Sequence, residues 1–385
     1  MVVPYARGVL CPAYDDGRCR SCRLLAVGYD EQLAGKAAHA AGLLAPFGDI
    51  AWEAPVPSAP AGYRNKAKLV VGGTLDAPTL GILDADHRGV DLQDCLLYED
   101  RLAATFPALA AFVTRAGLVP YAVPERSGEL KHLLVTVSPD GELMVRFVLR
   151  STESLARIRK HLPSLLAQLP QVAVASVNVL PAHAALLEGE REILLTEASA
   201  LRMRLAGIDL WLRPQGFFQT NSAVAAALYR QAAAWLADDP PASLWDLYCG
   251  VGGFALHAAA ATGARVLGVE SSEAAVAGAR SSAASAGLDA EFVAGDATAF
   301  ALGAPAADLP EVVVVNPPRR GIGAALAGWL EASAVPRVLY SSCHAESLAT
   351  DLAAMPSLRP VRGRLLDMFP QTAHDEVLVE LRRGA

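Results

Sequence analysis

The sequence has no run of apolar residues long enough to cross a membrane. Its most apolar helical stretch, residues 223–237, is interrupted by Arg230 and Gln231, and it is shorter than the ~20 residues that a bilayer requires. The first ten residues lack the basic start and the apolar core of a secretory signal. These absences speak against membrane-spanning and secreted proteins, so we expect a cytoplasmic protein.

Charged residues are also scarce, at 19% of the 385 residues, whereas hydrophobic residues make up 53%. This composition supplies a large core, speaks against extensive disorder and suits two or three domains. The net charge is −7, but residues 206–385 hold 12 arginines, no lysine and 18 acidic residues, while residues 1–205 are almost neutral and hold every lysine. Because a polyanion usually requires a basic face, any contact with RNA should lie mostly in the N-terminal half.

Cysteine is limited to six residues, and four of them lie in the first hundred positions. Cys19 and Cys22 have C-x-x-C spacing, which in a cytoplasmic chain indicates metal or redox chemistry rather than disulfides. Cys11 lies eight residues upstream, and Cys95 is the only other cysteine before Cys249. Four thiolates can hold zinc or an iron–sulfur cluster. One pair with two single cysteines favours the cluster over zinc or four free thiols, and we expect Cys249 to be a small buried residue.

The N-terminal half divides into two predicted parts. Residues 1–62 form a loop-rich segment around the cysteine pair, with one helix near residues 31–44, and Cys95 completes this segment. Residues 63–205 are predicted to form an α+β domain. Its clearest element is a hairpin of residues 131–138 and 142–150, joined by Pro139-Asp140-Gly141. A helix is expected over residues 152–162, and Pro163 should break or restart it.

From residue 206 onward the pattern changes to short strands that alternate with helices. Strands are predicted at residues 244–248, 265–270, 290–294, 311–315 and 337–340. Such alternation indicates a Rossmann-like α/β domain with a doubly wound parallel sheet over residues 206–385. Ligands of these sheets bind at the carboxyl ends of the strands, so that edge is where we expect the functional residues.

A glycine-rich loop follows the first of these strands, in the sequence Trp-Asp-Leu-Tyr-Cys-Gly-Val-Gly-Gly-Phe at residues 245–254. Glycines such as Gly250 let a ligand approach the backbone, and the helix that begins here favours an anionic group. Glu270 ends the next strand, where it can bind two ribose hydroxyls, and Asp296 adds an acid at the same edge. This pattern alone fits NAD or S-adenosylmethionine.

The fourth strand ends in Asn316-Pro317-Pro318, which favours methyl transfer. A dehydrogenase has no obvious use for this motif, whereas nucleic-acid methyltransferases carry Asn/Asp-Pro-Pro at this edge. In enzymes that methylate amino groups the next residue is typically aromatic, to stack on the base. Here it is Arg319, which indicates that the target atom is not an amine nitrogen.

Cys343 ends the fifth strand beside the same edge and is the candidate nucleophile. Carbon 5 of uracil is a poor nucleophile, but a thiolate that adds to carbon 6 makes an enolate that is reactive at carbon 5. A base must then remove the carbon-5 proton. We assign that role to Glu376, which lies in a polar cluster before an apolar strand, with His344 and His374 as alternatives.

Candidate RNA contacts lie in the N-terminal half. Arg64, Lys66 and Lys68 alternate along a predicted strand and can therefore share one face. The hairpin is expected to place further basic residues beside them, namely Lys131, Arg146 and Arg150.

With these motifs in hand, the chain resembles the RNA uracil-C5-methyltransferase family, and within it the branch that acts on large-subunit ribosomal RNA. The resemblance extends from Cys11 to Leu381 and includes residues 16–22, 63–68, 128–131, 213–221, 246–254, 315–323, 340–343 and 368–377. Only ten residues precede Cys11, which leaves no room for the N-terminal OB-like domain of the longer relatives. The tRNA-specific relatives lack the four-cysteine pattern.

The resemblance implies a class I methyltransferase fold in the C-terminal domain, with S-adenosylmethionine and a [4Fe–4S] cluster as cofactors and 23S rRNA as the partner. It implies no obligate protein partner and no membrane. Cluster ligands would be Cys11, Cys19, Cys22 and Cys95. Cofactor contacts would come from Gln219, Tyr248, Glu270 and Asn316. Cys343 would be the nucleophile and Glu376 the base.

Two departures from the family pattern are small: Tyr248 stands where Phe is common, and Asn316 is one form of an Asp/Asn position. Two alternatives stay open at this point. One is uracil-C5 methylation of another RNA site or of tRNA. The other is a metal-containing RNA-binding assembly factor that has lost catalysis.

Overall fold

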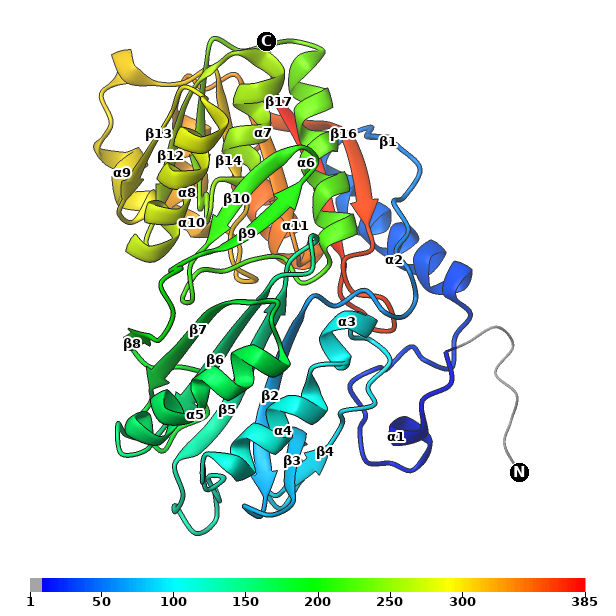
Figure 1. The fold of residues 1–385 in the computed structure, drawn as a ribbon. Helices are drawn as coiled ribbons and strands as arrows, with labels where there is room; N and C mark the ends of the chain where they lie inside the picture. The colour runs from blue at the N-terminus through cyan, green and yellow to red at the C-terminus, as the bar shows by residue number, and fades with distance from the viewer. Residues whose placement is uncertain (1–8, 385) are drawn as a thin grey trace.

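The computed structural model describes residues 9–384. Residues 1–8 and 385, which belong to the first and last predicted domains, lie outside the described residues. Two β-sheets dominate the fold and lie one above the other in Figure 1, with the blue N-terminal segment along one side. Within residues 9–384, no helix is both long and apolar enough to cross a bilayer.

The lower sheet in Figure 1 has seven strands in the order β4-β3-β2-β5-β6-β7-β8. They are β2 (Lys66–Gly73), β3 (Pro78–Leu83), β4 (Gly89–Asp91), β5 (Leu130–Val137), β6 (Leu143–Leu149), β7 (Val172–Val179) and β8 (Arg191–Leu194). One face packs against α4 (Phe106–Arg115) and α5 (Leu155–Gln168) in a single core, and the short α3 (Asp100–Ala103) precedes α4. Because side chains alternate along a strand, Lys66, Lys68 and His132 lie on the other face.

The predicted hairpin is confirmed, since β5 and β6 pair antiparallel on either side of Gly141. The predicted break at Pro163 is wrong, because α5 continues through this residue to Gln168. Proline removes one helical N–H, but Ile158, Leu162 and Leu165 are buried on both sides of it. Packing of this apolar face against the sheet therefore holds the helix together across the proline.

The upper sheet has eight strands in the order β1-β16-β17-β15-β14-β11-β12-β13. They are β1 (Ala51–Trp52), β11 (Ser243–Leu247), β12 (Arg265–Glu270), β13 (Ala290–Ala294), β14 (Val312–Val315), β15 (Arg337–Ser342), β16 (Leu358–Leu366) and β17 (Glu376–Arg383). The five strands from β15 to β13 are parallel, as predicted, and β17 inserts antiparallel between β15 and β16.

Helices cover both faces of the upper sheet, which is why its central strands are apolar throughout. One core contains α6 (Ser222–Ala237), α7 (Gly253–Thr262) and α8 (Glu273–Ala286), together with the hairpin of β9 (Leu201–Leu205) and β10 (Ile208–Leu212). The other contains α2 (Tyr29–Leu44), α9 (Ala297–Gly303), α10 (Gly323–Ala332) and α11 (Ala345–Ala353). The remaining short elements are α1 (Pro12–Asp15), η1 (Ala45–Phe47) and η2 (Ala306–Asp308).

The N-terminal segment joins the C-terminal sheet at its edge. β1 pairs in parallel with β16, Ala51 opposite Arg362. Helix α2 is fixed there by a buried ion pair in which Lys36 Nζ lies 2.6 Å from Asp367 Oδ1. Gln32 adds a buried hydrogen bond to Gln371. These contacts close the sheet with residues that lie more than 300 positions earlier in the chain.

Candidate active site

The carboxyl ends of the parallel strands surround a cavity of about 580 Å³. This is the sheet edge at which the sequence predicts the ligand site. All eight predicted cofactor and catalytic residues line this cleft, namely Gln219, Tyr248, Gly250, Glu270, Asp296, Asn316, Cys343 and Glu376. The ends of five parallel strands, β11 to β15, contribute to one site because these strands are neighbours in the sheet.

The glycine-rich loop is shaped to face a ligand. Tyr248 has a φ of 69°, which non-glycine residues rarely adopt, and Gly250 has a φ of 55°. The loop turns so that the Gly250 N–H donates to Glu270 Oε2 at 3.2 Å. Glu270 Oε1 accepts from the Ser272 N–H at 2.9 Å. These donors hold the carboxylate at the loop, in position to accept from vicinal hydroxyls.

Three further cofactor candidates, Gln219, Asp296 and Asn316, are held by hydrogen bonds. The side chain of Asn65 donates to the Gln219 carbonyl at 3.0 Å, which links the cleft to the start of β2. Asp296 Oδ1 caps α9 by accepting from the Ala299 N–H at 2.8 Å. Asn316 Nδ2 donates to Glu376 Oε1 at 3.2 Å. The cofactor edge and the catalytic carboxylate are therefore physically connected.

Glu376 is buried at the first position of β17. Its Oε1 also accepts a hydrogen bond from the Ser341 hydroxyl. Burial raises the pKa of Glu376 to about 7, although the hydrogen bonds from Ser341 and Asn316 oppose this shift. A carboxylate with a pKa near neutrality is suited to accept a proton at physiological pH.

Cys343 directly follows β15, the neighbour of β17. Ser342 pairs with Val377 in that ladder, so Cys343 and Glu376 extend from adjoining strands toward the same cleft. Burial raises the pKa of the Cys343 thiol to about 11, the charge of Glu376 raises it further, and Arg319 lowers it. The thiol is therefore protonated at rest, and Arg319 is the cation that favours its thiolate form.

The two histidine alternatives lie in different places. His374 lines the cleft, but its Nδ1 lies 2.9 Å from Arg319 Nη2. Burial, followed by the charge of Arg319, lowers the pKa of His374. His344 is not among the described residues that line the cleft, and its Nδ1 lies 2.8 Å from Ser347 Oγ. Geometry thus favours Glu376 over both histidines.

Sequence reasoning missed several cleft residues. Ser341 is the closest partner of Glu376, and Arg319 acts on Cys343, although both occur in motifs identified above. Phe217 and Phe369 line the cleft, and Phe217 is 67% exposed. Large apolar side chains are usually buried, so an exposed aromatic ring at a cleft indicates a contact with a ligand. The aromatic pair at residues 217–218 could have indicated this role, but it contributed above only to the family resemblance.

The predicted RNA-contact residues differ in how free they are. Arg64 and Lys66 are half-buried and Lys68 is exposed, and the two lysines lie on the face of the lower sheet opposite α4 and α5. Burial, followed by the charge of Arg146, lowers the pKa of Lys66 to about 8. Arg146 is buried, with Nη2 at 2.5 Å from Glu188 and 2.7 Å from Glu192. A guanidinium held by two carboxylates is poorly placed to bind phosphate.

The other two basic residues of this set also have partners. Lys131 Nζ donates to the Ala182 carbonyl at 2.6 Å and lies 4.7 Å from the centroid of the Tyr121 ring. Arg150 Nη2 donates to Glu129 at 3.0 Å. The hairpin strand therefore holds its cations in place rather than leaving them mobile in solvent.

Three of the four N-terminal cysteines, Cys11, Cys22 and Cys95, pack in a small core with Leu25, Tyr63 and Leu97. Cys19 is not part of this core, and none of the four forms a disulfide. Burial raises the pKa of the Cys22 thiol to about 12, and the charges of Cys95, Cys19 and Cys11 raise it further. Among residues 9–384, however, no group of three or more His, Cys, Asp or Glu is spaced as a metal site. Cys249 is buried, as predicted.

The sequence and the fold are similar to those of known methyltransferases. Residues 245–316 match the family described as Methyltransferase domain. The chain is 50% identical to the 23S rRNA (uracil(747)-C(5))-methyltransferase RlmC of Edwardsiella ictaluri, over 97% of this chain and 99% of the relative. It is 49% identical to the protein of the same name from Escherichia coli K12, over 96% and 99% of the two chains.

The crystal structure of Pyrococcus abyssi tRNA (uracil-54, C5)-methyltransferase in complex with S-adenosyl-L-homocysteine is also similar. It matches with a TM-score of 0.77 and 25% identity, over 94% of this chain and 85% of that chain. Fold and cleft define a class I, Rossmann-like S-adenosylmethionine-dependent methyltransferase. The chain belongs to the RNA uracil-C5-methyltransferase family, together with the RlmC proteins.

Proposed function

We propose that this protein transfers a methyl group from S-adenosylmethionine to carbon 5 of a uridine in 23S rRNA, at the position equivalent to 747. The names of relatives that are about 50% identical over nearly the whole chain support the substrate. The observation that carries the proposal is the convergence of Cys343, Glu376 and the glycine-rich loop on one cleft.

The cleft fits the proposed cofactor. Glu270 presents a carboxylate to the loop for the ribose hydroxyls, and the N-terminus of α7 lies behind Gly250. Gln219, Tyr248, Asp296 and Asn316 would complete the contacts. When bound, S-adenosylmethionine supplies an electrophilic methyl group.

We assign three steps to residues of this chain. The Cys343 thiolate adds to carbon 6 of uracil, which forms a carbon–sulfur bond and moves the double-bond electrons toward oxygen 4. Carbon 5 then takes the methyl group from the sulfonium, whose sulfur–methyl bond breaks so that S-adenosylhomocysteine is the leaving group. Glu376 removes the proton from carbon 5, the double bond re-forms, and the thiolate leaves. Phe217 offers an exposed ring on which the target base can stack.

The pKa shifts suit this division of work. Cys343 needs to lose its proton only when uracil is present, and its raised pKa keeps the free thiol resistant to oxidation. Glu376 has a pKa near neutrality, so it is partly ionised at pH 7 and becomes fully available above that value.

The experiment that tests the proposal is the mapping of 5-methyluridine by mass spectrometry. Unmodified 23S rRNA would be incubated with the protein and the cofactor, and the products compared with a reaction that lacks the protein. We expect one methylated uridine, at the position equivalent to 747. Methylation at a different 23S site or in tRNA only would refute the substrate, and no methylation of any RNA would refute the activity.

We further propose that Cys11, Cys19, Cys22 and Cys95 hold a [4Fe–4S] cluster. Support comes from the chemistry of the donor set: all four cysteines are free thiols, the charges of the other three act on Cys22, and sulfur is the ligand that such clusters use. The cluster would tie the N-terminal segment, residues 1–62, to Cys95 in the central domain, residues 63–205. Methyl transfer in residues 206–385 needs no electron, so we assign the cluster a structural role.

Protein purified without oxygen is expected to be brown and to contain roughly four iron atoms per chain. Replacing Cys22 with serine should remove the iron and the colour, because the buried ligand is lost. The matched control is Cys249→Ala, a buried cysteine of the other domain, which should keep the iron. Stoichiometric zinc without iron in the wild-type protein would contradict the cluster.

We propose that Arg64, Lys66 and Lys68 bind RNA phosphates and that Lys131 and Arg150 add to the positive charge of this domain. Arg146, which pairs with Glu188 and Glu192, would stabilise β6 rather than bind phosphate. Changing the first three to glutamine is expected to weaken RNA binding and reduce the slope of log affinity against log salt by about 2, since each lost single-strand contact contributes ~0.7. Gel shifts at several salt concentrations would measure this slope.

The control for this variant changes three exposed cations on α4 and α5, Arg115, Arg159 and Lys160, which cover the opposite face of the same sheet. This control alters net charge equally and should leave the slope unchanged. Equal slopes in the two triple variants would show that the sheet face carrying Lys66 and Lys68 does not bind RNA.

A further inference from the structure

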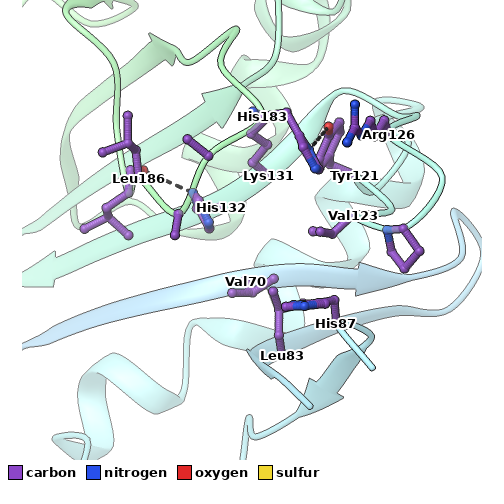
Figure 2. A pocket seen from close by; sticks show the side chains of 14 residues that line it. Val70, Leu83, His87, Tyr121, Val123, Arg126, Lys131, His132, His183 and Leu186 are labelled. Carbon is purple, nitrogen blue, oxygen red and sulfur yellow. Dashed lines mark hydrogen bonds between the residues drawn. The ribbon is translucent and has the colours of Figure 1, made fainter. Parts of the chain in front are cut away.

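A second cavity, of about 680 Å³, lies in the lower sheet and shares no lining residue with the catalytic cleft. Its walls come from the end of β2 at Val70, the β3–β4 turn at His87, the loop at residues 121–126 and the loop at residues 183–187. Figure 2 shows Tyr121 and His183 together at one end, with His132 beside the 183–187 loop. Nothing in the proposed reaction uses this cavity.

One end of the cavity carries two rings that contact each other, Tyr121 and His183. Tyr121 Oη lies 2.9 Å from His183 Nδ1, and the two ring centroids are 6.2 Å apart (Figure 2). Tyr121 is buried and is fixed from the side by the Lys131 ammonium, whereas His183 is exposed. The exposed imidazole, held at its edge by the Tyr121 hydroxyl, is a surface on which a nucleobase can stack.

The other end offers a hydrogen-bond acceptor of defined orientation. His132 Nδ1 lies 3.1 Å from the Leu187 carbonyl, and a carbonyl oxygen can only accept. Burial lowers the pKa of His132 to about 4, so the ring is neutral at physiological pH. The proton must then sit on Nδ1, which leaves Nε2 as an acceptor for an amino or imino group of a base.

The charge of the cavity suits an anionic ligand. Among the described residues that line it, none is acidic, while Lys131 and the exposed Arg126 are basic. Three carboxylates near the lining loops in the sequence are paired with arginines: Glu129 with Arg150, Glu125 with Arg88 and Glu188 with Arg146. In a protein with a net charge of −7, this is a local site for a phosphate.

Strand β2 connects the two cavities. Asn65, just before β2, bonds to Gln219, which lines the catalytic cleft, and Val70 lines the second cavity. Residues Lys66, Lys68 and Val70 point to the same face, because side chains alternate along a strand. The five steps from Asn65 to Val70 span roughly 17 Å at ~3.3 Å per residue. Lys66 and Lys68 therefore lie on β2 between the two cavities.

From this geometry we propose that the second cavity binds another unpaired nucleotide of the RNA whose uridine enters the catalytic cleft. Its base stacks on His183 and donates a hydrogen bond to His132 Nε2, and its phosphate lies near Arg126. The backbone between the two nucleotides runs along Lys66 and Lys68. The inference depends on the proposed function, since it assumes an RNA substrate.

The test is the double variant Arg126→Ala/His183→Ala, which changes two exposed side chains and should fold normally. Its matched control is Arg159→Ala/His161→Ala on α5, which covers the opposite face of the sheet. Both would be assayed with a 23S rRNA fragment. We expect the KM for RNA to rise about tenfold in the cavity variant, because loss of one base stack has an effect of this order. Its kcat should stay within about twofold of wild type.

A second variant, His132→Phe, keeps a ring of similar shape but removes the acceptor, and should also raise KM without lowering kcat. Photocrosslinking of 4-thiouridine-substituted fragment to the wild-type protein should label peptides from residues 121–126 or 183–187. If the wild type methylates the fragment but both cavity variants match the control in KM, the nucleotide site is refuted and a protein ligand becomes the better explanation. If the wild type methylates no RNA, the proposed function itself fails.

Discussion

Replacing Cys343 with alanine is expected to abolish formation of 5-methyluridine, with a loss of at least ~10⁴-fold. Without the thiolate, carbon 6 receives no nucleophile and carbon 5 stays unreactive. Binding of RNA and of the cofactor should persist, because the residues assigned to both surround Cys343 but do not bond to its sulfur. Methyl transfer with labelled cofactor would measure turnover, and gel shifts and calorimetry would measure the two affinities.

A covalent trap provides the control for this result. RNA with 5-fluorouridine at the target position should crosslink to the wild-type protein, because fluorine cannot leave as a proton does. The crosslinked peptide should contain Cys343, and Cys249→Ala should crosslink as well, since the nucleophile is intact. Turnover near the wild-type level in Cys343→Ala, or a crosslink to another cysteine, would show that the proposed mechanism is wrong.

Replacing Glu376 with glutamine is expected to stop the reaction at a later point. Addition and methyl transfer can proceed, but no group removes the carbon-5 proton, so the methylated base stays bonded to Cys343. The adduct should survive denaturing electrophoresis, and turnover should fall by ~10²–10⁴-fold, the usual contribution of a general base. This variant therefore gains a protein–RNA band under conditions in which Cys343→Ala shows none.

Stability measurements separate this effect from unfolding. The folded-state pKa of Glu376 is raised to about 7 by burial, above its value in the unfolded chain. The folded protein therefore binds the proton more tightly, and this contribution to stability is lost as pH rises through about 7. Glutamine carries no charge, so the variant should melt at or above the wild-type temperature at pH 8.

Glu346→Gln is the matched control, since this carboxylate is exposed and bonds to His39. It should methylate normally and leave no adduct. Full activity without an adduct in Glu376→Gln would show that Glu376 is not the base. His374, which also lines the cleft, would then be the next candidate.

That the candidate site residues line one cleft could be predicted, because most of them follow parallel strands. Cys343, Asn316 and Glu270 each end a strand, and the geometry of a doubly wound sheet places such ends together whatever the intervening sequence. Glu376 was harder to place, because its strand is antiparallel and its partner Ser341 precedes it by 35 residues.

The face of the lower sheet was predictable only in part. Alternation correctly placed Lys66 and Lys68 on one face. It could not show that Arg146 is held by Glu188, in a loop, and by Glu192, in β8, both more than 40 residues later. The second cavity has no sequence motif at all, since Tyr121 and His183 are 62 residues apart.

The closure of the upper sheet by β1 and α2 has a consequence for synthesis on the ribosome. Ala51 emerges early, but its partner Arg362 is made 311 residues later, which at ~5–20 residues per second is a delay of roughly 15–60 s. During that interval Lys36 cannot form its ion pair with Asp367, and the apolar face of α2 cannot pack against the completed sheet. The methyltransferase domain therefore completes its fold only when the last strands arrive, and the first-made segment is the last to be fixed.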